Sequence, residues 1–375
     1  MKTCCVDIVA PHYRFDIFSK MQEELSCDFY FGQPFGSISK IKTIPLSSFN
    51  THAELLKNID LHFLHGYWQC GVIGLLRKDY NVYILGGDII CLSTWLFMFL
   101  NRLFFHKKVL LWGHGWYGRE SSFRAFINKI YLSLADHIMV YGDRAKRLMI
   151  QNGSSSRRIT PIHNSLSYSK QLDVIKRIPD NNPFLSHFKN NHPVVIFTGR
   201  LTPVKKINMI VQALSMLKNE GVFVNCVLLG DGPEMQLLKD LVEKLKLNSN
   251  FWFYGACYDE LTIGSMYWYA SVCVSPGNVG LTAIHSLTYG CPVITHNDFS
   301  HQMPEFEAIT PGKTGDFFEC ENCSALKETI KKWIDLSTRN KQSIRKACQD
   351  TVQKGWTPEY QIRVIKECCS LVYSE

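Results

Sequence analysis

The sequence VVIFTGRLTPVKK, Val194–Lys206, decides the fold that we expect for this chain. Its first five residues are apolar or β-branched, which predicts a strand buried on both faces, and Gly199 ends that strand with a turn. Three cations follow, Arg200, Lys205 and Lys206. Ligands of open α/β sheets bind at the carboxyl ends of the strands, where fixed cations suit a diphosphate. A solvated basic turn is the simpler alternative.

Strand and helix patterns alternate along most of the chain. Before this stretch, the patterns predict strands at 4–10, 27–32, 82–85, 109–112, 138–141 and 159–162, with helices at 15–24, 123–134 and 144–151. After it, they predict strands at 224–229, 250–254, 271–275 and 292–295, with helices at 234–246, 281–289 and 325–336. Such alternation is typical of the α/β class, in which a parallel sheet has helices on both faces.

The length of 375 residues fits two doubly wound, Rossmann-like domains. We expect the first at 1–170, a polar linker at 171–192 and the second at 193–356. The last segment, 357–375, reads as a helix that packs back on the first domain. Two such domains in tandem would face each other across a cleft.

The net charge of +8 belongs to the first part of the chain, because residues 1–170 hold 20 Lys and Arg against 12 Asp and Glu. This excess suits an anionic partner, such as a membrane surface, a phosphorylated acceptor or nucleic acid, or it is diffuse solubility charge. No nucleic-acid recognition motif is present, so we expect no nucleic-acid partner.

The 14 cysteines sit mostly in apolar runs, which predicts reduced, buried thiols in a cytoplasmic protein. Cys320 and Cys323 form the only CxxC pair, and zinc would need a second pair, so we expect no metal. Asp7 interrupts the N-terminal apolar run and argues against a signal peptide. The most apolar segment, 82–105, is read as a core strand and helix, or alternatively as a patch on a membrane.

Sequence landmarks in the second half follow one another in a recognisable order over about 120 residues. They are GRL-x3-K at 199–205, GDGP at 230–233, F-x-G at 253–255, SPGNVGL at 275–281, YGCPVIT at 289–295, and PE with G-x-x-G at 304–305 and 312–315. With these motifs the chain resembles GT-B glycosyltransferases of the family-4 type, which retain configuration when they transfer a sugar from a nucleotide donor. Fainter matches in the first half are Tyr13-Arg14, His114-Gly115 and Asn164.

The resemblance implies a role for each matching position. His114, Arg200 and Lys205 would be catalytic, with the two cations on the donor diphosphate and His114 on the transferred sugar. The donor would contact Gly199, Arg200, Lys205, Tyr254, Gly255, Asn278, Val279, Gly280, Leu281, His285 and Glu305. The acceptor would lie near Tyr13, Arg14, Trp116 and Tyr117. Backbone N–H groups of the Gly277–Gly280 turn would point at a phosphate, and no cofactor is implied.

The chain departs from the family where a Glu-x7-Glu pair is usual, because Gly277 and His285 occupy those positions. Glu305 and Glu307 are the nearest replacement carboxylates. Three accounts follow: an active transferase of a divergent branch, an inactive GT-B binding or partner subunit, and a GT-B nucleotide-sugar epimerase. We favour the transferase, acting in surface or capsular polysaccharide synthesis on a glycan or lipid-diphosphate-linked acceptor. Basic and aromatic residues of the first half suit peripheral contact with the inner face of the cell membrane.

Overall fold

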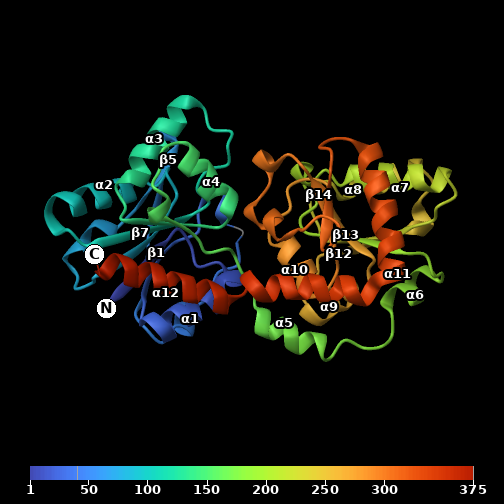
Figure 1. Ribbon diagram of the computed structural model, residues 1–375, viewed down its shortest axis with the longest axis horizontal. Coiled ribbons are helices and arrows are strands. Elements are labelled where there is room, and N and C mark those ends of the chain that lie inside the picture. The colour runs from blue at the N-terminus through green and yellow to red at the C-terminus, as the bar shows by residue number, and fades with distance from the viewer. Residues whose placement is uncertain (40, 375) are drawn as a thin grey trace. The chain divides into compact units, whose positions relative to one another are not determined.

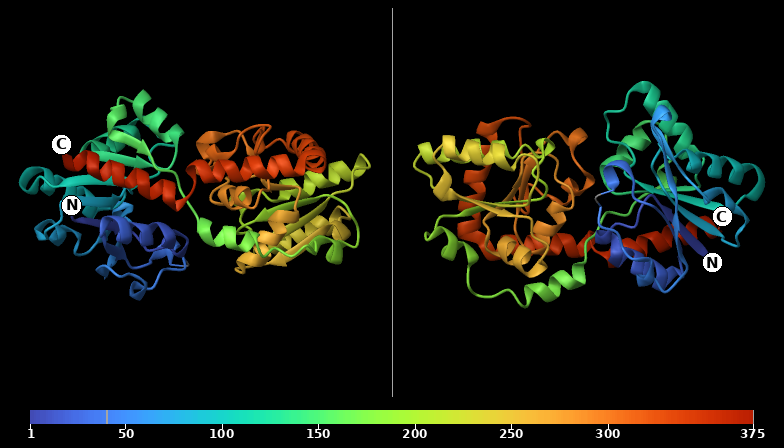
Figure 2. Two further views of the ribbon diagram at one scale, coloured as in Figure 1. Left: turned by 60° about the horizontal axis from the view of Figure 1, so that its bottom comes forward. Right: turned by 180° about the vertical axis from the view of Figure 1, so that it is seen from behind.

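A computed structural model describes residues 1–39 and 41–374, and its chain divides into two compact units (Figure 1). Unit 1 comprises Met1–Ser167 and the C-terminal segment that starts at Thr357. Unit 2 comprises Tyr168–Trp356. Each unit holds a parallel sheet with helices on both faces, which Figure 2 shows from two further sides. The predicted α/β class is therefore confirmed. Residue 375, the end of the predicted last segment, lies outside the described residues.

The sheet of unit 1 has seven parallel strands in the order β3-β2-β1-β6-β7-β8-β9. Their bounds are β1 Thr3–Asp7, β2 Asp28–Gly32, β3 Ala53–Leu56, β6 Val82–Gly86, β7 Lys108–Gly113, β8 His137–Val140 and β9 Ile159–Pro161. The main helices are α1 Phe15–Leu25, α2 Leu92–Leu100, α3 Ser122–Ser133 and α4 Asp143–Gln151. A separate antiparallel hairpin joins β4 Asn58–Leu61 to β5 Gly66–Gln69. The sequence patterns predict neither this hairpin nor β3; the residues of β3 and β4 are largely exposed, whereas those of β5 are mostly buried.

The last helix, α12 Pro358–Ser374, belongs to the core of unit 1. Its buried face, which includes Ile365 and Cys369, joins the apolar cluster that α1 and β2 form. Gln361 is buried and accepts a hydrogen bond from Ser165 Oγ at 2.6 Å, while its own Nε2 donates to the carbonyl of His163 at 2.8 Å. Unit 1 is therefore built from an N-terminal and a C-terminal segment of the chain, which pack in one core.

The sheet of unit 2 has six parallel strands in the order β12-β11-β10-β13-β14-β15. Their bounds are β10 Val194–Thr198, β11 Asn225–Leu229, β12 Phe251–Gly255, β13 Val272–Ser275, β14 Val293–His296 and β15 Gly315–Phe318. The main helices are α7 Asn208–Asn219, α8 Met235–Lys244, α9 Glu260–Tyr269, α10 Thr282–Thr288 and α11 Cys323–Gly355, which has non-helical backbone angles at Asn340. Val194–Phe197 are buried, as expected for a central strand with helices on both faces.

The expected linker is corrected by the structure. Residues 171–192 contain most of α5 Tyr168–Ile175 and all of α6 Pro183–Phe188, and both helices belong to unit 2. Gln171 is buried and donates to Glu260 of α9 at 3.2 Å. The sequence does not predict these helices, because Pro and Asn residues between them are typical of a loop. Asn182 in fact caps α6, with its side chain accepting from the N–H of Phe184.

The apolar segment 82–105 forms β6, α2 and the π-helix η6 Asn101–Phe105. Phe97 and Met98 are buried against the sheet, whereas Phe99 and Phe104 remain 52% and 69% exposed. Among the described residues, no helix combines the length and apolar character needed to cross a membrane. The segment thus forms a strand and a helix with one face in the core, as the first interpretation predicts, while contact of its exposed apolar face with a membrane stays a prediction.

We expect the substitution Ile365→Ala to destabilise unit 1, because it empties a fully buried site of α12. Removing a buried aliphatic side chain costs about 2–5 kcal/mol of unfolding free energy. Chemical denaturation of the variant measures this loss. Ser370→Ala, at an exposed position of the same helix, serves as the control and should change stability little. Equal stability of Ile365→Ala and the control would contradict the assignment of α12 to this core.

Candidate active site

The turn after β10 carries Arg200, and neighbouring glycines allow its close packing. Gly199 has a φ of 135°, and a Cβ on Gly230 would lie only 1.8 Å from the carbonyl oxygen of Gly199. The N–H of Leu201 donates to the carbonyl of Asp231 at 3.0 Å. The GDGP motif thus supports the turn from the side of β11. Arg200 itself is exposed at the carboxyl edge of the sheet and has no ion pair with another described residue.

Lys205 is held by the loop that follows β13. Its Nζ donates to the carbonyl oxygen of Asn278 at 2.7 Å and to Asn278 Oδ1 at 2.8 Å. Burial lowers the pKa of Lys205, and the negative charge of nearby Glu305 opposes that shift. An ammonium with partly restricted solvent access therefore lies at the carboxyl edge, between the loops that follow β10 and β13. Glu305 itself is 2% exposed.

At Gly277, the loop after β13 packs directly on the backbone of Val204 and Lys205. The N–H of Gly277 donates to the carbonyl of Lys205 at 3.0 Å, and a Cβ at this position would lie 2.0 Å from the carbonyl oxygen of Val204. Real Cβ atoms do not approach other atoms so closely, so this loop conformation excludes any side chain at position 277. This lack of space is a steric reason why position 277 carries no carboxylate, unlike the family-4 pattern.

A buried amide, which the sequence analysis missed, supports the same loop. Gln302 is 2% exposed; its Oε1 accepts from the N–H of Val279 at 2.8 Å, and its Nε2 donates to Thr295 Oγ1 at 2.8 Å. Thr295 Oγ1 in turn donates to the carbonyl of Ser275 at 2.8 Å. The N–H of Val279 is thus already bonded within the protein, which corrects the expectation that it points at a phosphate. No sequence signal relates Gln302 to this loop.

His285, the residue at the second departed position, pairs with a carboxylate from another helix. Its Nε2 lies 2.8 Å from Glu260 Oε1, and the hydroxyl of Tyr289 donates to the same oxygen at 2.7 Å. Burial raises the pKa of Glu260, but the hydrogen bonds from His285 and Tyr289 outweigh it, so the pKa is lowered overall. Glu260, which sequence reasoning also missed, therefore places an ionised carboxylate beside His285.

The remaining predicted donor contacts lie at neighbouring loops of the same sheet edge. Tyr254 and Gly255 end the outer strand β12, where Tyr254 is 36% exposed and Gly255 has a φ of 89°. Gly280 and Leu281 directly precede α10, and Leu281 is its N-cap residue. Their contact with a donor stays a prediction.

In unit 1, a groove of about 750 Å³ lies at the carboxyl ends of β1, β6, β7 and β8 and is lined by Arg14, His114 and Tyr117, among others. Arg14 donates to Asp7 Oδ2 at 2.7 Å and also to the hydroxyl of Tyr141. Burial and the charge of Arg14 lower the pKa of His114 to about 4, so its imidazole is neutral at pH 7. Nδ1 of His114 is buried and has no hydrogen-bond partner among the described residues.

Two residues predicted on the acceptor side do not line this groove. Trp116 is 7% exposed and packs in a core cluster with Ile138 and Met149, because Gly115 adopts a φ of 67° that turns the chain inward. Tyr13 is 41% exposed on the short helix η1 His12–Arg14. The structure therefore keeps Arg14, Tyr117 and His114 together and separates the side chain of Trp116 from them.

Comparisons with known proteins bear on both units. The family model described as "Glycosyl transferases group 1" matches residues 180–350, which lie within unit 2. Among proteins of curated function, none matches this sequence significantly. The described residues contain no group of three or more His, Cys, Asp or Glu side chains that could hold a metal ion.

Several solved structures resemble the whole chain. HepE of Anabaena, in complex with UDP, aligns with a TM-score of 0.74 at 14% identity, over 99% of this chain and 100% of that one. A glycosyltransferase of Rickettsia africae aligns with a TM-score of 0.74 at 18% identity, over 99% and 98%. Sucrose-phosphate synthase of Thermosynechococcus elongatus aligns with a TM-score of 0.69 at 15% identity, over 100% of both chains. At these identities the likeness concerns the fold, and the predicted GT-B fold is confirmed.

Restoring a carboxylate at position 277 should disrupt the site. We expect Gly277→Glu to lower the thermal midpoint, because its Cβ would meet the carbonyl of Val204 at 2.0 Å and push the two loops apart. Differential scanning calorimetry measures the change. Gly280→Ala is the matched control, since its Cβ would meet only Met303 at 3.8 Å. A Gly277→Glu protein as stable as the control would contradict the steric explanation.

Proposed function

We propose that this protein, which has the GT-B fold and whose residues 180–350 match the model of glycosyl transferases group 1, transfers a sugar from a nucleoside-diphosphate sugar. The observation that carries the proposal is the placement of Arg200 and Lys205 at the carboxyl edge of one sheet. That edge is where open α/β sheets bind ligands.

The chemistry of the reaction explains why this position matters. The bond between the anomeric carbon and the diphosphate breaks, so negative charge grows on the leaving group in the transition state. Cations that are already in place stabilise that charge without having to reorganise. Lys205 is fixed by Asn278, and Arg200 has an exposed guanidinium that suits bidentate contact with phosphate oxygens. Since these side chains supply positive charge, the proposal invokes no metal.

For the donor, structural likeness supports a uridine nucleotide as the first choice to test. HepE was crystallised with UDP and with UDP-glucose, and TarM of S. aureus was crystallised with UDP. We propose that the donor binds mainly to unit 2. The predicted contacts with Gly199, Tyr254, Gly255, Asn278, Gly280, Leu281, His285 and Glu305 belong to this proposal. Retention of configuration is also proposed, through a front-face course in which a phosphate oxygen of the donor takes the acceptor proton.

We propose that the acceptor binds in the groove of unit 1 beside Arg14 and Tyr117, with His114 contacting the transferred sugar. A neutral imidazole suits this role, because it can donate one hydrogen bond and accept another. The ion pair of Arg14 with Asp7 holds that guanidinium in the lining of the same groove. A glycan or lipid-diphosphate-linked acceptor, used in surface polysaccharide synthesis, fits the proposal.

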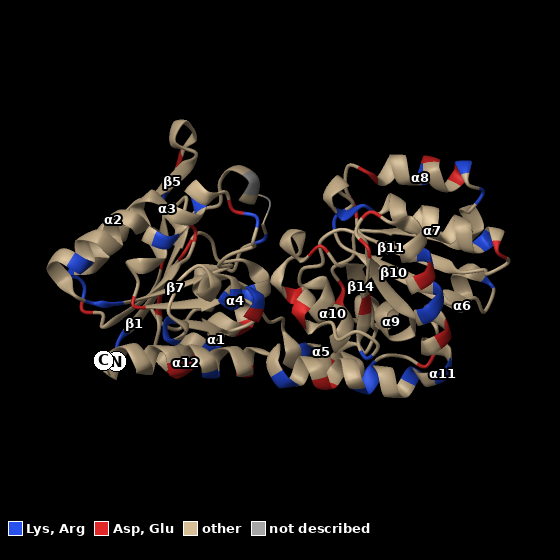
Figure 3. Ribbon diagram, turned by 45° about the horizontal axis from the view of Figure 1, so that its top comes forward, with Lys and Arg blue, Asp and Glu red and all other residues tan. Residues whose placement is uncertain are grey.

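A lipid-linked acceptor would require the protein to reach a membrane, and one surface of unit 1 suits that task. Exposed apolar residues follow one face of α2 and η6 and one face of α3; they are Leu96, Phe99, Leu103, Phe104, Phe123, Phe126 and Ile130. The two helices are adjacent, since the rings of Trp95 and Tyr131 lie 4.9 Å apart. Basic residues, which include Arg102 and Arg124, lie on the same elements (Figure 3). We propose that this apolar and basic surface docks on an anionic membrane.

The alternatives make different predictions about turnover. An inactive GT-B subunit would bind a nucleotide sugar without consuming it, whereas an epimerase would interconvert nucleotide sugars without an acceptor. The two cations at this edge, Arg200 and Lys205, favour the transferase because they can stabilise a leaving diphosphate, and nucleotide-sugar binding without turnover would identify the inactive subunit. Thermal stabilisation by a panel of UDP-, GDP- and TDP-sugars identifies the donor, since a ligand at about 100 times its Kd adds roughly 2.7 kcal/mol.

We expect Arg200→Ala and Lys205→Ala each to slow transfer by on the order of 100-fold, through lost stabilisation of the leaving diphosphate. Release of the nucleoside diphosphate in a steady-state assay measures this loss. Lys244→Ala removes an exposed cation at the end of α8 and serves as the control. Near-normal turnover of both site variants would refute the assignment.

The docking surface is tested by sedimentation with phosphatidylglycerol-containing vesicles at low salt. The wild-type protein should pellet, and Phe123→Glu combined with Phe126→Glu should abolish pelleting, because both positions are exposed and the charge opposes insertion. Leu237→Glu, at a 66% exposed position of α8 in unit 2, provides the control. A wild-type protein that stays in the supernatant would show the docking proposal to be wrong.

A further inference from the structure

A second hollow of about 310 Å³ adjoins the groove of unit 1 and has no assigned role. Ile8, His65, Tyr67, Asp88 and Ile90 line both spaces, so the two share a wall. The rest of the hollow is lined by Asp60 of β4, by His62 and Gly66, and by Phe35, Gly36 and Ile38 at the short helix η2 Gly36–Ile38. Its volume is at the lower end of the range for small-ligand sites.

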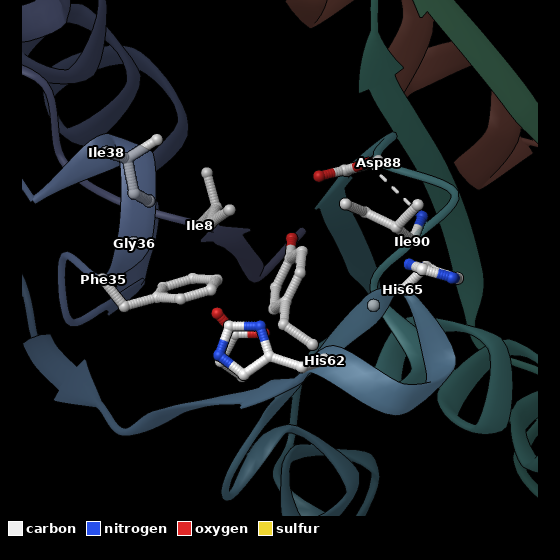
Figure 4. Close-up of a pocket in the computed structure, with 11 residues that line it drawn as sticks. Ile8, Phe35, Gly36, Ile38, His62, His65, Asp88 and Ile90 are labelled. Carbon is white, nitrogen blue, oxygen red and sulfur yellow. Dashed lines mark hydrogen bonds and ion pairs between the residues drawn. The ribbon is translucent and has the colours of Figure 1, made fainter.

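The walls of this hollow combine aromatic and carboxylate groups. The rings of Phe35 and Tyr67 lie 5.3 Å apart at an angle of 52°. Asp60 and Asp88 contribute two carboxylates, and Asp60 Oδ1 lies 3.3 Å from His62 Nδ1. Figure 4 shows the Phe35 ring, the Ile8 side chain and the Asp88 carboxylate directed toward the middle of the hollow.

The two spaces differ in charge. The groove is lined by three arginines, Arg14, Arg119 and Arg124, in addition to its acidic residues. The hollow is lined by two aspartates and two histidines, and no Lys or Arg is among its described lining residues. An anion in the hollow would therefore meet two carboxylates and no Lys or Arg among the described residues that line it, whereas a neutral group with hydroxyls could donate hydrogen bonds to those carboxylates.

We propose that this hollow is an acceptor subsite for an uncharged saccharide residue, next to the residue that receives the transferred sugar. Pyranose rings present hydroxyl groups at their edges and C–H groups on their faces. The carboxylates of Asp60 and Asp88 accept hydrogen bonds from the hydroxyls, and the ring of Phe35 contacts the C–H face. Burial raises the pKa of Asp88, which a hydroxyl donor would counteract. A sugar that carries a carboxylate is repelled by the same groups.

This inference rests on the proposed glycosyltransferase function and deepens it by naming the acceptor class. It predicts an acceptor of at least two saccharide residues, one in the groove near His114 and an uncharged one in the hollow. The hollow thus acts in specificity, and it takes no part in the chemical step.

Saturation-transfer NMR on the full chain tests the subsite with matched probes. The probes are the methyl glycosides of glucose and galactose and the corresponding methyl glucuronide and galacturonide, which differ only in the carboxylate at C6. We expect at least one neutral glycoside to bind the wild-type protein, with at least fivefold weaker binding of its anionic counterpart. Phe35→Ala should weaken binding of the neutral probe at least fivefold.

The charge argument has its own variant and control. Asp60→Asn should narrow the preference for the neutral probe, because the substitution removes one repelling charge and keeps the size of the side chain. Asp60 is partly exposed on the hairpin, so the variant should fold normally. Asp79→Asn, at an exposed position outside the hollow, should leave the preference unchanged. Absence of binding by both neutral probes, equal binding of the anionic probes, or an unaltered preference in Asp60→Asn would overturn the proposal.

Nucleotide-sugar stabilisation of the same preparation separates this inference from the proposed function. Saccharide binding without stabilisation by any nucleotide sugar would contradict the proposed transferase function and would still support a sugar site in the hollow. Stabilisation by a nucleotide sugar without saccharide binding would sink the subsite and leave the transferase intact.

Discussion

The contact of two loops at the carboxyl edge of unit 2 is the constraint on which the rest of the candidate site depends. Gly277 packs its backbone on Val204 and Lys205, with no room for a Cβ, and the Lys205 ammonium reaches back to Asn278. Each loop therefore fixes the other. A flexible lysine becomes a positioned cation because its rotamer entropy is lost during folding, before any ligand arrives. Preorganisation of this kind is what stabilisation of a leaving diphosphate requires.

The same contact explains how this site differs from the family-4 pattern that the sequence resembles. Position 277 cannot carry a carboxylate while the loops touch, and position 285 carries an imidazole. Carboxylates still surround the region, since Glu260 binds His285 and Glu305 lies near Lys205. Glu260 comes from α9 and Glu305 from the segment after β14. Glu260 forms a hydrogen bond with His285, and the charge of Glu305 acts on Lys205. The carboxylates near this edge therefore come from other elements than positions 277 and 285, where the family-4 pattern has them.

The sequence was informative wherever a pattern is local. Strands such as β10 and β7 are predicted correctly because burial on both faces demands a continuous apolar run. Strands β3 and β4 have mostly exposed side chains, so no buried run marks them, and β5 is mostly buried but only four residues long. The motifs located Arg200 and Lys205, but Gln302 and Glu260 reach the site from separate loops and helices. Spacing along the chain carries no information about such tertiary partners.

The two spaces in unit 1 show how one sheet edge can hold groups of opposite charge. The side chain of Arg14 is 14% exposed beside Asp7, which offsets part of its charge, and the remaining positive charge still lowers the pKa of His114. The neighbouring carboxylates have other partners: Asp60 lies 3.3 Å from His62 Nδ1, and Asp88 accepts from the N–H of Ile90 at 3.3 Å, while burial raises the pKa of Asp88. Asp60 is 32% exposed and Asp88 is half-buried, so both carboxylates can accept further hydrogen bonds, and the hollow favours a guest with many hydroxyl groups. The charge of the hollow, more than its shape, thus restricts what can bind there, next to the groove that His114 lines.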